Sequence, residues 1–410
     1  MRVFSEKEEF GEVCNLRPLI ACLSLWERCP GGGEGPLSHG LRRDSNKLRS
    51  NCHRQLFHSI RCATHRPKGG AKGAPRHLDK FLFSASPHTR TLYRQGTKTM
   101  DRYIYALGFF DGVHLGHQAL LKAVKDLSGS AGKGVITFAA HPDTLVFGQT
   151  PKLINTPQDR VRLLKSFGME RVVTLPFDRK MCTTSWLAFL EELRRNYGAA
   201  GFVCGEDFRF GSGGEGTAEL LRDYCGREGL PCAVVPEQIV EGTRVSSTVI
   251  REQLIRGDMA RAVRFLGHPY LLTGQVVHGK QLGRTLGIPT ANLLLPPELA
   301  TPRFGVYGGL ALVEGDWYPA VTNIGVRPTV SGTGITVEPW ILDYSGDLYD
   351  RTICLELTDF VRPERKFGSL EELKDEIHRN AETTRELVRT SLMFKKNSQG
   401  SACFAEENQL

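Results

Sequence analysis

The sequence predicts an α/β protein in which a doubly wound parallel sheet is followed by a small antiparallel β-barrel and a C-terminal helix. From Met100 to about Val235, short apolar runs alternate with segments of helical periodicity, a pattern typical of parallel strands covered by helices. From Pro269 onward, short segments alternate apolar with polar residues and are separated by glycines, which favours an antiparallel barrel. A chain of 410 residues is long enough for two or three domains.

Composition narrows the class of protein. Hydrophobic residues make up 40% of the chain and charged residues 24%, as in soluble globular proteins. The sequence contains no run of about 18 apolar residues, so no transmembrane helix is expected. None of the eleven cysteines forms a C-x-x-C pair, which disfavours a zinc site. Scattered, reduced thiols are typical of a cytoplasmic protein, and we predict that location.

Residues 1–99 differ from the rest of the chain. They carry a net charge of +10, whereas residues 100–410 carry a net charge of −2, so the basic character lies in this segment alone. The segment lacks sustained periodicity, and we expect a disordered basic extension with a short helix near Val13–Trp26. Arg17 and the acidic residues before it disfavour a secretory signal. The second methionine is Met100, so the segment is either upstream sequence read from an early start codon or, as a weaker alternative, a basic RNA-binding tail.

The alternating part contains the elements of a parallel sheet, each assigned from its apolar period. The predicted strands are Tyr103–Leu107, Gly134–Phe138, Arg171–Leu175, Gly201–Cys204 and Cys232–Val235. The predicted helices are Gln118–Leu127, Gln158–Phe167, Ser185–Asn196 and Thr217–Glu228. In such a sheet, ligands bind beyond the carboxyl ends of the strands, so the residues that follow each strand are the candidates for a site.

The first of these strand ends carries the most informative pattern. Gly108 ends the strand, and Asp111-Gly112 forms a turn before a helix that begins between Val113 and Leu115. His114 and His117 lie three residues apart and therefore share one face of the helix's first turn. Helix N-termini attract phosphate oxygens through free N–H groups, and two imidazoles can donate hydrogen bonds to the same oxygens.

The glycines near the two histidines, Gly112 and Gly116, leave room for a nucleotide to approach the backbone. Together with the histidines they predict a site that holds a triphosphate while its α-phosphorus is attacked. The alternative is an ordinary strand–turn–helix corner with two surface histidines, which explains each feature separately but not their coincidence.

Two further strand ends carry polar or aromatic residues. His141-Pro142 follows the second strand, and the loop from Gly205 to Gly211 follows the fourth. In that loop, Asp207 and Phe208 are placed to meet a planar aromatic substrate, one by a hydrogen bond and the other by stacking. The alternative is a glycine-bounded loop whose aromatic residues belong to the core.

The segment Arg244–Arg251 predicts a second helix N-terminus. Ser246 or Ser247 is a suitable N-cap for a helix that continues to about Ile255. Ser247, Thr248 and Arg251 would then grip phosphate from the side opposite the histidines; an ordinary capped helix is the alternative. After Gly257-Asp258 a further helix spans Met259–Leu266, so residues 244–268 form a helical bridge to the barrel.

The barrel part ends in a helix from Leu370 to about Val388 and a polar tail from Lys395. Its predicted strands are Leu271–His278, Ala291–Leu295, Val306–Val313, Tyr318–Ile324, Thr336–Leu342 and Arg351–Leu357. A glycine-rich loop with Gly279, Gly283 and Gly287 and the cations Lys280 and Arg284 suits polyphosphate. The hydroxyl of Thr290 and the amide oxygen of Asn292 are oxygen ligands of the kind that Mg²⁺ prefers.

Several of these segments together resemble a known family. The H-x-G-H at His114 resembles the signature of the nucleotidylyltransferase superfamily, and the longer G-F-F-D-G-V-H-L-G-H resembles its version in the bacterial bifunctional riboflavin kinase/FMN adenylyltransferases, also called FAD synthetases. The loop at Asp207 is similar to the family's G-x-D-F-x-F-G, and the segment at Ser247 to its S-S-T-x-I-R. Two positions depart from the family: Phe109, where it often has Asn, and Ala139-Ala140, where it commonly has Glu-Pro.

The barrel segments resemble the riboflavin kinase domain of the same family. The glycine-rich loop and Pro289-Thr290-Ala291-Asn292 are similar to its flap and its P-T-A-N motif. This resemblance implies that the residues that bind ATP in the barrel are Gly279, Lys280, Gly283, Arg284, Thr285 and Pro289. Downstream, Asn323–Thr329 and Val337-Glu338 followed by Leu342-Asp343 match the same domain. The resemblance implies that Glu338 activates the ribityl hydroxyl of riboflavin; taken alone, Glu338 would be an exposed strand carboxylate. Pro339-Trp340 departs from the residue pair more usual there.

The resemblance implies a bifunctional enzyme of FAD biosynthesis. The barrel would phosphorylate riboflavin to FMN with ATP, and the α/β domain would adenylylate FMN to FAD with release of pyrophosphate. Mg²⁺ would be the cofactor, and ATP, riboflavin and FMN the substrates. The residues implied as catalytic are Glu338, His114, His117 and Arg251, and those implied for ATP binding in the α/β domain are Gly108, Phe109, Asp111, Gly112, Gly116, Ser247 and Thr248.

The predicted domains follow from these boundaries. They are a basic extension (1–99), an adenylyltransferase domain (100–243), the helical bridge that completes its site (244–268), a riboflavin kinase domain (269–390) and a polar tail (391–410). We expect small-molecule partners only, without membrane or nucleic-acid binding and with at most weak self-association. The alternatives are a nucleotidylyltransferase with another acceptor, which the barrel motifs argue against, and a non-catalytic flavin- or RNA-binding protein, which the motifs in both domains argue against.

The first testable prediction concerns residues 1–99. A chain that begins at Met100 is expected to have the same melting temperature as the full chain and to keep both activities, because a segment without apolar periodicity buries too little surface to offset its ordering entropy. Thermal unfolding and flavin assays of the two chains measure this. A docked helix would instead lower the melting temperature on truncation, and an RNA arm would give salt-sensitive RNA binding by the full chain only.

Overall fold

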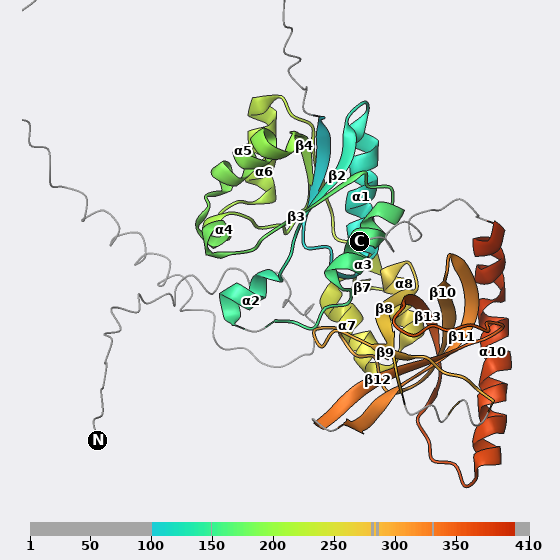
Figure 1. The fold of residues 1–410 in the computed structure, drawn as a ribbon. Helices are drawn as coiled ribbons and strands as arrows, with labels where there is room; N and C mark the ends of the chain where they lie inside the picture. Colours follow the sequence, from blue (N-terminus) through green and yellow to red (C-terminus); the bar gives the residue numbers. More distant parts are fainter. Residues whose placement is uncertain (1–100, 149, 280–282, 284–286, 330–331, 398–410) are drawn as a thin grey trace, which may run out of the picture. The chain divides into compact units, whose positions relative to one another are not determined.

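The structure is a computed structural model that describes residues 101–148, 150–279, 283, 287–329 and 332–397 (Figure 1). The helix predicted near Val13–Trp26 and the rest of the basic extension lie outside these residues, as do Lys280, Arg284 and Thr285 of the glycine-rich loop. Within the described part, both predicted domains are present.

The first domain is built on a parallel five-stranded sheet of order β3-β2-β1-β4-β5. Its strands are β1 (Tyr103–Leu107), β2 (Gly132–Phe138), β3 (Arg171–Leu175), β4 (Ala199–Gly205) and β5 (Cys232–Val235). Side chains of alternating residues point to opposite faces of the sheet, so Ile104 and Ala106 join one hydrophobic cluster while Tyr105 and Leu107 join another. The doubly wound sheet predicted from the sequence is confirmed.

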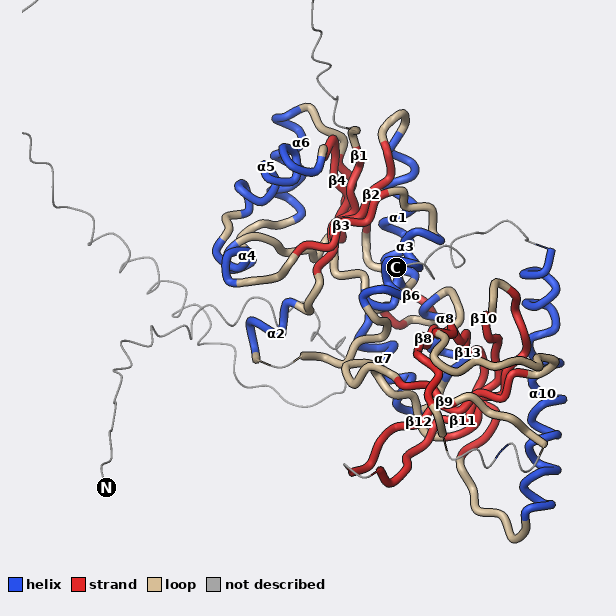
Figure 2. Tube along the Cα trace, viewed as in Figure 1, coloured by secondary structure: helices blue, strands red, loops and turns tan. Residues whose placement is uncertain are grey.

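Helices cover both faces of this sheet (Figure 2). Helices α1 (Leu115–Ser128) and α3 (Pro157–Ser166) pack on one face, and α5 (Trp186–Tyr197) and α6 (Ala218–Glu228) on the other. Capping residues start them: the hydroxyls of Thr156, Ser185 and Thr217 accept backbone N–H groups at α3, α5 and α6. Since β1 lies at the centre of the sheet, the carboxyl end of β1 lies where the strand order reverses, the usual ligand position in such folds.

Some short elements were not expected from the sequence. They are η1 (Asp111–Val113), α2 (Pro142–Phe147), α4 (Arg179–Thr183), η2 (Ser212–Gly214) and the hairpin of β6 (Ile239–Val240) with β7 (Thr243–Arg244). Each is too short to show a hydrophobic period, which needs a window of about 11–18 residues. Two longer helices follow as predicted, α7 (Ser247–Arg256) and α8 (Met259–Leu266), separated by Gly257-Asp258.

The second domain is a closed antiparallel barrel of strand order β10-β11-β12-β9-β8-β13. The strands are β8 (Tyr270–Val277), β9 (Asn292–Leu294), β10 (Gly305–Val313), β11 (Asp316–Thr329), β12 (Gly332–Ile341) and β13 (Thr352–Pro363). Strands β11 and β13 extend well past their predicted ends at Ile324 and Leu357, because backbone pairing with β12 and β10 continues there without apolar alternation. The predicted barrel is confirmed.

The C-terminal helix α10 (Leu370–Asn397) runs beside the barrel and is longer than the predicted Leu370–Val388 (Figure 1). Its last turns are held by Lys395, whose Nζ lies 2.7 Å from the buried carboxylate of Glu356 and 3.6 Å from the ring centroid of Trp317. The helix therefore includes the residue at which the polar tail was expected to start. The extension could not be predicted from the sequence, because Lys395 is held by residues of strands that are distant in the chain.

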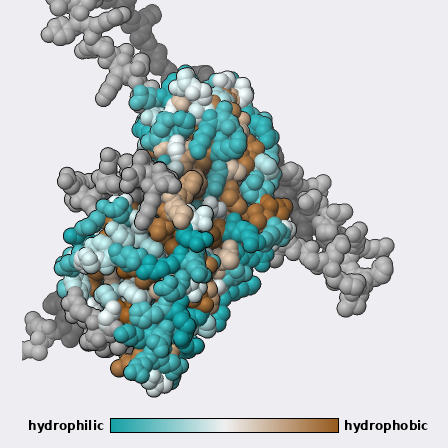
Figure 3. Space-filling view, turned by 90° about the vertical axis from the view of Figure 1, so that its right-hand side faces the viewer, coloured by the Kyte–Doolittle hydropathy of each residue, from teal (hydrophilic) through white to brown (hydrophobic). Residues whose placement is uncertain are grey.

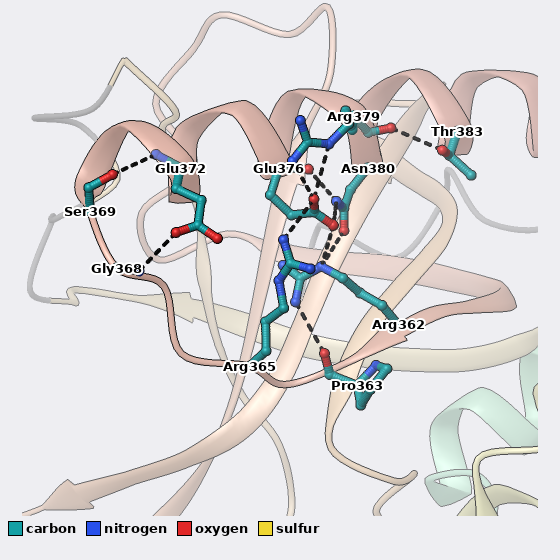
Figure 4. Close-up of polar contacts among 10 residues, drawn as sticks. All are labelled: Arg362, Pro363, Arg365, Gly368, Ser369, Glu372, Glu376, Arg379, Asn380 and Thr383. Carbon is teal, nitrogen blue, oxygen red and sulfur yellow. Dashed lines mark hydrogen bonds and ion pairs between the residues drawn. The ribbon is translucent and has the colours of Figure 1, made fainter.

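The first turns of α10 are fixed by a group of arginines around Glu376 (Figure 4). The Glu376 carboxylate lies 3.3 Å from Arg362 of β13, 3.0 Å from Arg365 and 2.7 Å from Arg379. Hydrogen bonding by Arg379 is the largest cause that lowers the pKa of Glu376. Because Arg362 also donates to Asn380 Oδ1 at 2.8 Å, the end of β13 and the helix are joined by a polar network.

The helical bridge and the barrel share one hydrophobic cluster. It includes Leu254 of α7, Phe265 of α8 and, in the barrel, Tyr270 and Leu355. Among the described residues no helix has the length and apolar character needed to cross a membrane. Figure 3 shows one face of the surface, where hydrophilic residues predominate and hydrophobic residues occur in small groups, as is usual for a protein surface.

Candidate active sites

The first candidate site is a cleft at the carboxyl edge of the parallel sheet. It lies between the residues that follow β1, β4 and β5 and the start of α7, the usual position of a ligand site in a parallel α/β sheet. The predicted residues that line it are Gly108, Phe109, Asp111, His114, Gly116, His117, Asp207, Phe208 and Ser247. Gly112, Thr248 and Arg251 are not in its lining.

The two histidines of the H-x-G-H segment occupy the start of α1. His114 is the N-cap, and its Nδ1 accepts a hydrogen bond from the backbone N–H of His117 at 3.4 Å. The two rings stack with centroids 3.7 Å apart, and His117 also lies 5.0 Å from the ring of Phe110. Both histidines thus face the cleft from one helix end, as the sequence predicts.

The electrostatic environment keeps these imidazoles neutral. Burial, together with the charges of His268 and Arg251, lowers the pKa of His114 from 6.5 to about 3. Burial and the neighbouring His114 and Arg160 lower the pKa of His117 well below its usual value. Because His114 Nδ1 accepts a hydrogen bond, the proton of its neutral ring lies on Nε2, which can donate to a ligand.

A third histidine outside the predicted set belongs to the same region. His141 caps α2, its Nδ1 accepts the backbone N–H of Asp143 at 3.2 Å, and its ring meets that of Phe109 edge-on at 4.6 Å. Burial is the main cause that lowers the pKa of His141 to about 4. Two helix N-caps are therefore unprotonated imidazoles, since a protonated Nδ1 cannot accept a hydrogen bond.

We expect the free energy of unfolding to fall as the pH drops below about 6.5, because the unfolded chain then binds protons on His114, His117 and His141 that the folded chain does not bind. The stabilising contribution of each neutral histidine is fully present above the unfolded pKa of 6.5. As the pH falls from this value to the folded pKa of that residue, each histidine lowers the free energy of unfolding by about 1.4 kcal/mol per pH unit. Urea unfolding between about pH 5 and 8 measures it.

The matched variant is His141→Asn, because asparagine is a good N-cap and does not titrate. It should fold normally at neutral pH and lose less stability than the parent on acidification. An equally steep acid dependence in this variant would contradict the assignment of the effect to His141.

Asp111, predicted as an ATP contact, lines the cleft and also binds groups of the protein itself. It is 2% exposed, and its carboxylate accepts the backbone N–H groups of Ile154 at 2.9 Å and Asn155 at 3.3 Å. Arg251 Nη2 lies 3.6 Å away, and burial, opposed chiefly by this arginine, raises the pKa of Asp111. Through these contacts, the Asp111 carboxylate holds Arg251 and residues 154–155 in place.

The two glycines beside the histidines also make room mainly for protein atoms. A Cβ at Gly112, which has φ +79°, would lie 2.9 Å from Ile154, so the space predicted for a nucleotide there is filled by side chains. A Cβ at Gly116 would lie 3.1 Å from the ring of His114. Gly116 thus allows the histidine stack, and it still lines the cleft.

The start of α7 meets the H-x-G-H segment directly. Ser246 is the N-cap, since its hydroxyl accepts the backbone N–H of Val249 at 3.3 Å. Ser247 Oγ donates to the backbone oxygen of Asp111 at 2.9 Å. With Arg251 near Asp111, the two predicted phosphate-binding segments are brought together, although they are far apart in the sequence.

The residues predicted for flavin binding already have partners in the cleft. The Asp207 carboxylate pairs with Arg244, whose Nη1 also lies 2.9 Å from Glu237. Phe208 is 8% exposed and stacks on Phe210 with ring centroids 5.5 Å apart. Sequence reasoning did not single out Arg244, which lines the cleft, although its place just before the S-S-T segment was an available signal.

The second candidate site lies on the barrel around Glu338. Pairing places Asn323 of β11 opposite Glu338 of β12, and the Val337–Leu293 pair places Asn292 of β9 opposite Glu338 on its other side. Because side chains alternate across a strand, these three residues share one face, and Ile324, Val337 and Leu293 point to the barrel core. The register thus brings the predicted Asn292 and Glu338 together.

The described part of the glycine-rich loop meets the P-T-A-N segment. A Cβ at Gly279 would lie 2.2 Å from the Asn292 carboxamide, and a Cβ at Gly283 would lie 3.2 Å from Thr290 Oγ1. Pro289 is exposed and Thr290 is half-buried. The glycines therefore allow the loop to approach the two proposed Mg²⁺ ligands closely.

Comparison with known proteins finds relatives of both domains. A family model described as FAD synthetase matches residues 97–249, and one described as riboflavin kinase matches residues 266–388. The bifunctional riboflavin kinase/FMN adenylyltransferase of Escherichia coli strain K12 is 36% identical over 72% of this chain and 96% of its own length. The protein of the same name from Bacillus subtilis strain 168 is 33% identical over 73% of this chain and 96% of its own length.

A solved structure is also similar over most of the described chain. It is described as a macrolide-efflux protein from Streptococcus pneumoniae, is 32% identical, and covers 70% of this chain and 95% of its own with a TM-score of 0.64. The likeness spans both domains in sequence order.

Proposed function

We propose, from the premise that this chain belongs to the bifunctional riboflavin kinase/FMN adenylyltransferase family, that the two candidate sites divide the family's two reactions between them. The enzyme forms FMN from riboflavin and FAD from FMN. The cleft at His114 and His117 adenylylates FMN, and the barrel face at Glu338 phosphorylates riboflavin. The observation that carries this assignment is the joining of the H-x-G-H and S-S-T-x-I-R segments at one cleft by the Ser247–Asp111 hydrogen bond.

In the adenylylation step, a phosphate oxygen of FMN attacks the α-phosphorus of ATP. The new bond forms between these atoms as the bond from the α-phosphorus to the bridging oxygen breaks, and pyrophosphate leaves with the electron pair. The nucleophile is already ionised, so no general base is required. His114, through Nε2–H, together with His117 and Arg251, stabilises the charge that develops on the phosphates. Gly108, Phe109, Gly116, Ser247 and Thr248 line or flank the nucleotide position.

In the phosphorylation step, Glu338 accepts the proton of the riboflavin hydroxyl as its oxygen attacks the γ-phosphorus of ATP, and ADP leaves. The half-buried position of Glu338 beside Asn292 and Asn323 supports this role. Catalysis of this kind depends mainly on positioning and charge neutralisation. Lys280, Gly283, Arg284, Thr285 and Pro289 remain the proposed ATP contacts of this site.

Thr290 and Asn292 are the proposed Mg²⁺ ligands. Their oxygens suit this ion, and the lack of side chains at Gly279 and Gly283 lets the glycine-rich loop pack closely against both residues. Among the described residues no group of three or more His, Cys, Asp or Glu side chains is placed to hold a metal, so the remaining ligands would come from ATP. When bound, Mg²⁺ neutralises charge on the phosphates.

We also propose a cytoplasmic location and small-molecule partners only. The five cysteines of the described residues are all free thiols, as in a reducing compartment. The net charge of −2 on residues 100–410 offers no excess of cations to a nucleic acid. At most weak self-association is expected.

The assignment is tested by incubating the protein with riboflavin, ATP and Mg²⁺ and separating the flavins over time. FMN should appear first and FAD afterwards, and added FMN should give FAD with one pyrophosphate released for each. Formation of FMN without FAD, or release of pyrophosphate without a flavin product, would contradict it.

A further inference from the structure

Arg160 of α3 is the largest fully buried side chain of the described structure and has no role in the sites as predicted. It is 1% exposed, and its Nη2 donates to the backbone oxygen of Phe138 at 2.7 Å. The guanidinium carbon lies 4.2 Å from the ring centroid of Phe109, a cation–π contact. Arg160 therefore reaches from its helix to the carboxyl ends of β1 and β2, behind a ring that lines the cleft.

The positive charge of Arg160 is stabilised at a distance by the buried carboxylate of Asp111 but is not held in an ion pair. Within the described residues its Nε and Nη1 have no hydrogen-bond partner, and no Asp or Glu forms an ion pair with it. Burial lowers the pKa of Arg160 to about 10, which leaves the side chain charged at neutral pH. A buried cation with two unused donors is costly, so such groups are normally paired. The positive charge of Arg160 is therefore only partly neutralised within the described residues.

The neighbours of Arg160 belong to the adenylyltransferase site. Its charge contributes to the lowered pKa of both His117 and His141 and acts on the carboxylate of Asp111. Asn155, 1% exposed in the segment held by Asp111, has an amide group with neither its oxygen nor its nitrogen hydrogen-bonded to a described residue. Asn155 and Arg160 thus share Asp111 as a neighbour, on the segment that leads to the histidines.

We propose that Arg160 is a positioning residue of the adenylyltransferase site, which draws the polyphosphate of ATP, and the pyrophosphate it becomes, into the cleft. This rests on the proposed function of the cleft. Arg160 acts through Phe109: its planar group supports one face of the ring, and its positive charge, held in a dry environment, reaches the cleft with little screening. The alternative is that Arg160 only packs against Phe109 and supports the fold.

The proposal predicts that removing the charge weakens polyphosphate binding without unfolding the protein. Arg160→Met removes an unpaired buried charge and keeps the length of the side chain, so the melting temperature should change little. Arg160 acts on the ligand at a distance, through Phe109 and through the electric field of its charge, so the affinity for pyrophosphate should fall about 10-fold. The KM for ATP in FAD formation should rise by a similar factor, with the KM for FMN and riboflavin phosphorylation unchanged.

The experiment measures pyrophosphate binding by titration calorimetry and both activities for the parent, Arg160→Met, Arg160→Gln and Arg160→Lys. Arg160→Gln also removes the charge but keeps a donor for the Phe138 carbonyl. It therefore replaces Arg160→Met as the neutral variant if the methionine variant does not fold. Arg160→Lys keeps the charge and should restore most of the affinity. The matched control is Arg162→Met on the same helix, which loses an arginine that pairs with Asp159 at 3.2 Å and is 27% exposed.

Two outcomes would overturn the proposal. One is a folded Met or Gln variant that binds pyrophosphate as the parent does. The other is an Arg160→Lys variant that binds pyrophosphate as weakly as the Met and Gln variants, with activity that decreases in proportion to the melting temperature. That result would leave Arg160 with a packing role only. Absence of FAD formation by the parent would instead overturn the proposed function, while the pyrophosphate titration would still decide the role of Arg160.

Discussion

Glu338→Gln is expected to lose riboflavin phosphorylation almost completely and to keep FAD formation from added FMN. Glutamine has nearly the same shape but cannot take the hydroxyl proton, and loss of a general base typically costs about 10²–10⁴-fold in rate. The second activity should survive because its residues lie on the other domain, at the cleft around His114. Separation of riboflavin, FMN and FAD after incubation with ATP and Mg²⁺ measures both reactions in one sample.

The control for this variant is Glu314→Gln, which changes an exposed carboxylate in the turn between β10 and β11 and should leave both activities intact. If Glu338→Gln folds and both activities are lost, the division of labour between the domains is wrong. If it phosphorylates riboflavin at the parent's rate, Glu338 is only a strand carboxylate.

His117→Ala is expected to slow FAD formation from FMN by roughly 10²–10³-fold, because it removes one donor aimed at the transition-state phosphates. Riboflavin phosphorylation by the same chain should be unchanged, which shows that the variant is folded. Steady-state rates with FMN and ATP measure the first effect, and rates with riboflavin and ATP the second.

Lys122→Ala is the matched control, because it removes an exposed cationic side chain from the same helix. Lys122 pairs with Asp126 at 2.6 Å. It should not affect either rate. A near-normal rate of FAD formation by His117→Ala would favour the alternative of a structural corner with two histidines that do not take part in the reaction.

The parts of the fold that the sequence predicted well are those with long, strong periodicity. Strand Tyr103–Leu107 has the predicted bounds because a buried parallel strand is a continuous apolar run closed by Gly108. The barrel was predicted from alternation, yet the ends of β11 and β13 were missed, because pairing in a sheet continues wherever a neighbour offers backbone groups. Helix α10 continues beyond its predicted end at Val388, because Lys395 near its C-terminus pairs with Glu356 of strand β13.

In the candidate sites, too, local features could be predicted from the sequence and contacts between distant residues could not. The sequence by itself singled out His114, His117 and Glu338 as candidate site residues, because residue type, spacing and the nearby helix or strand signals are local. Only the tertiary structure decided that Asp111 binds backbone and Arg251, that Gly112 makes room for Ile154, and that Arg160 lies charged behind Phe109. These roles depend on burial and on partners distant in the chain. A periodic pattern marks which face of a helix is buried but not which charge on that face lacks a partner.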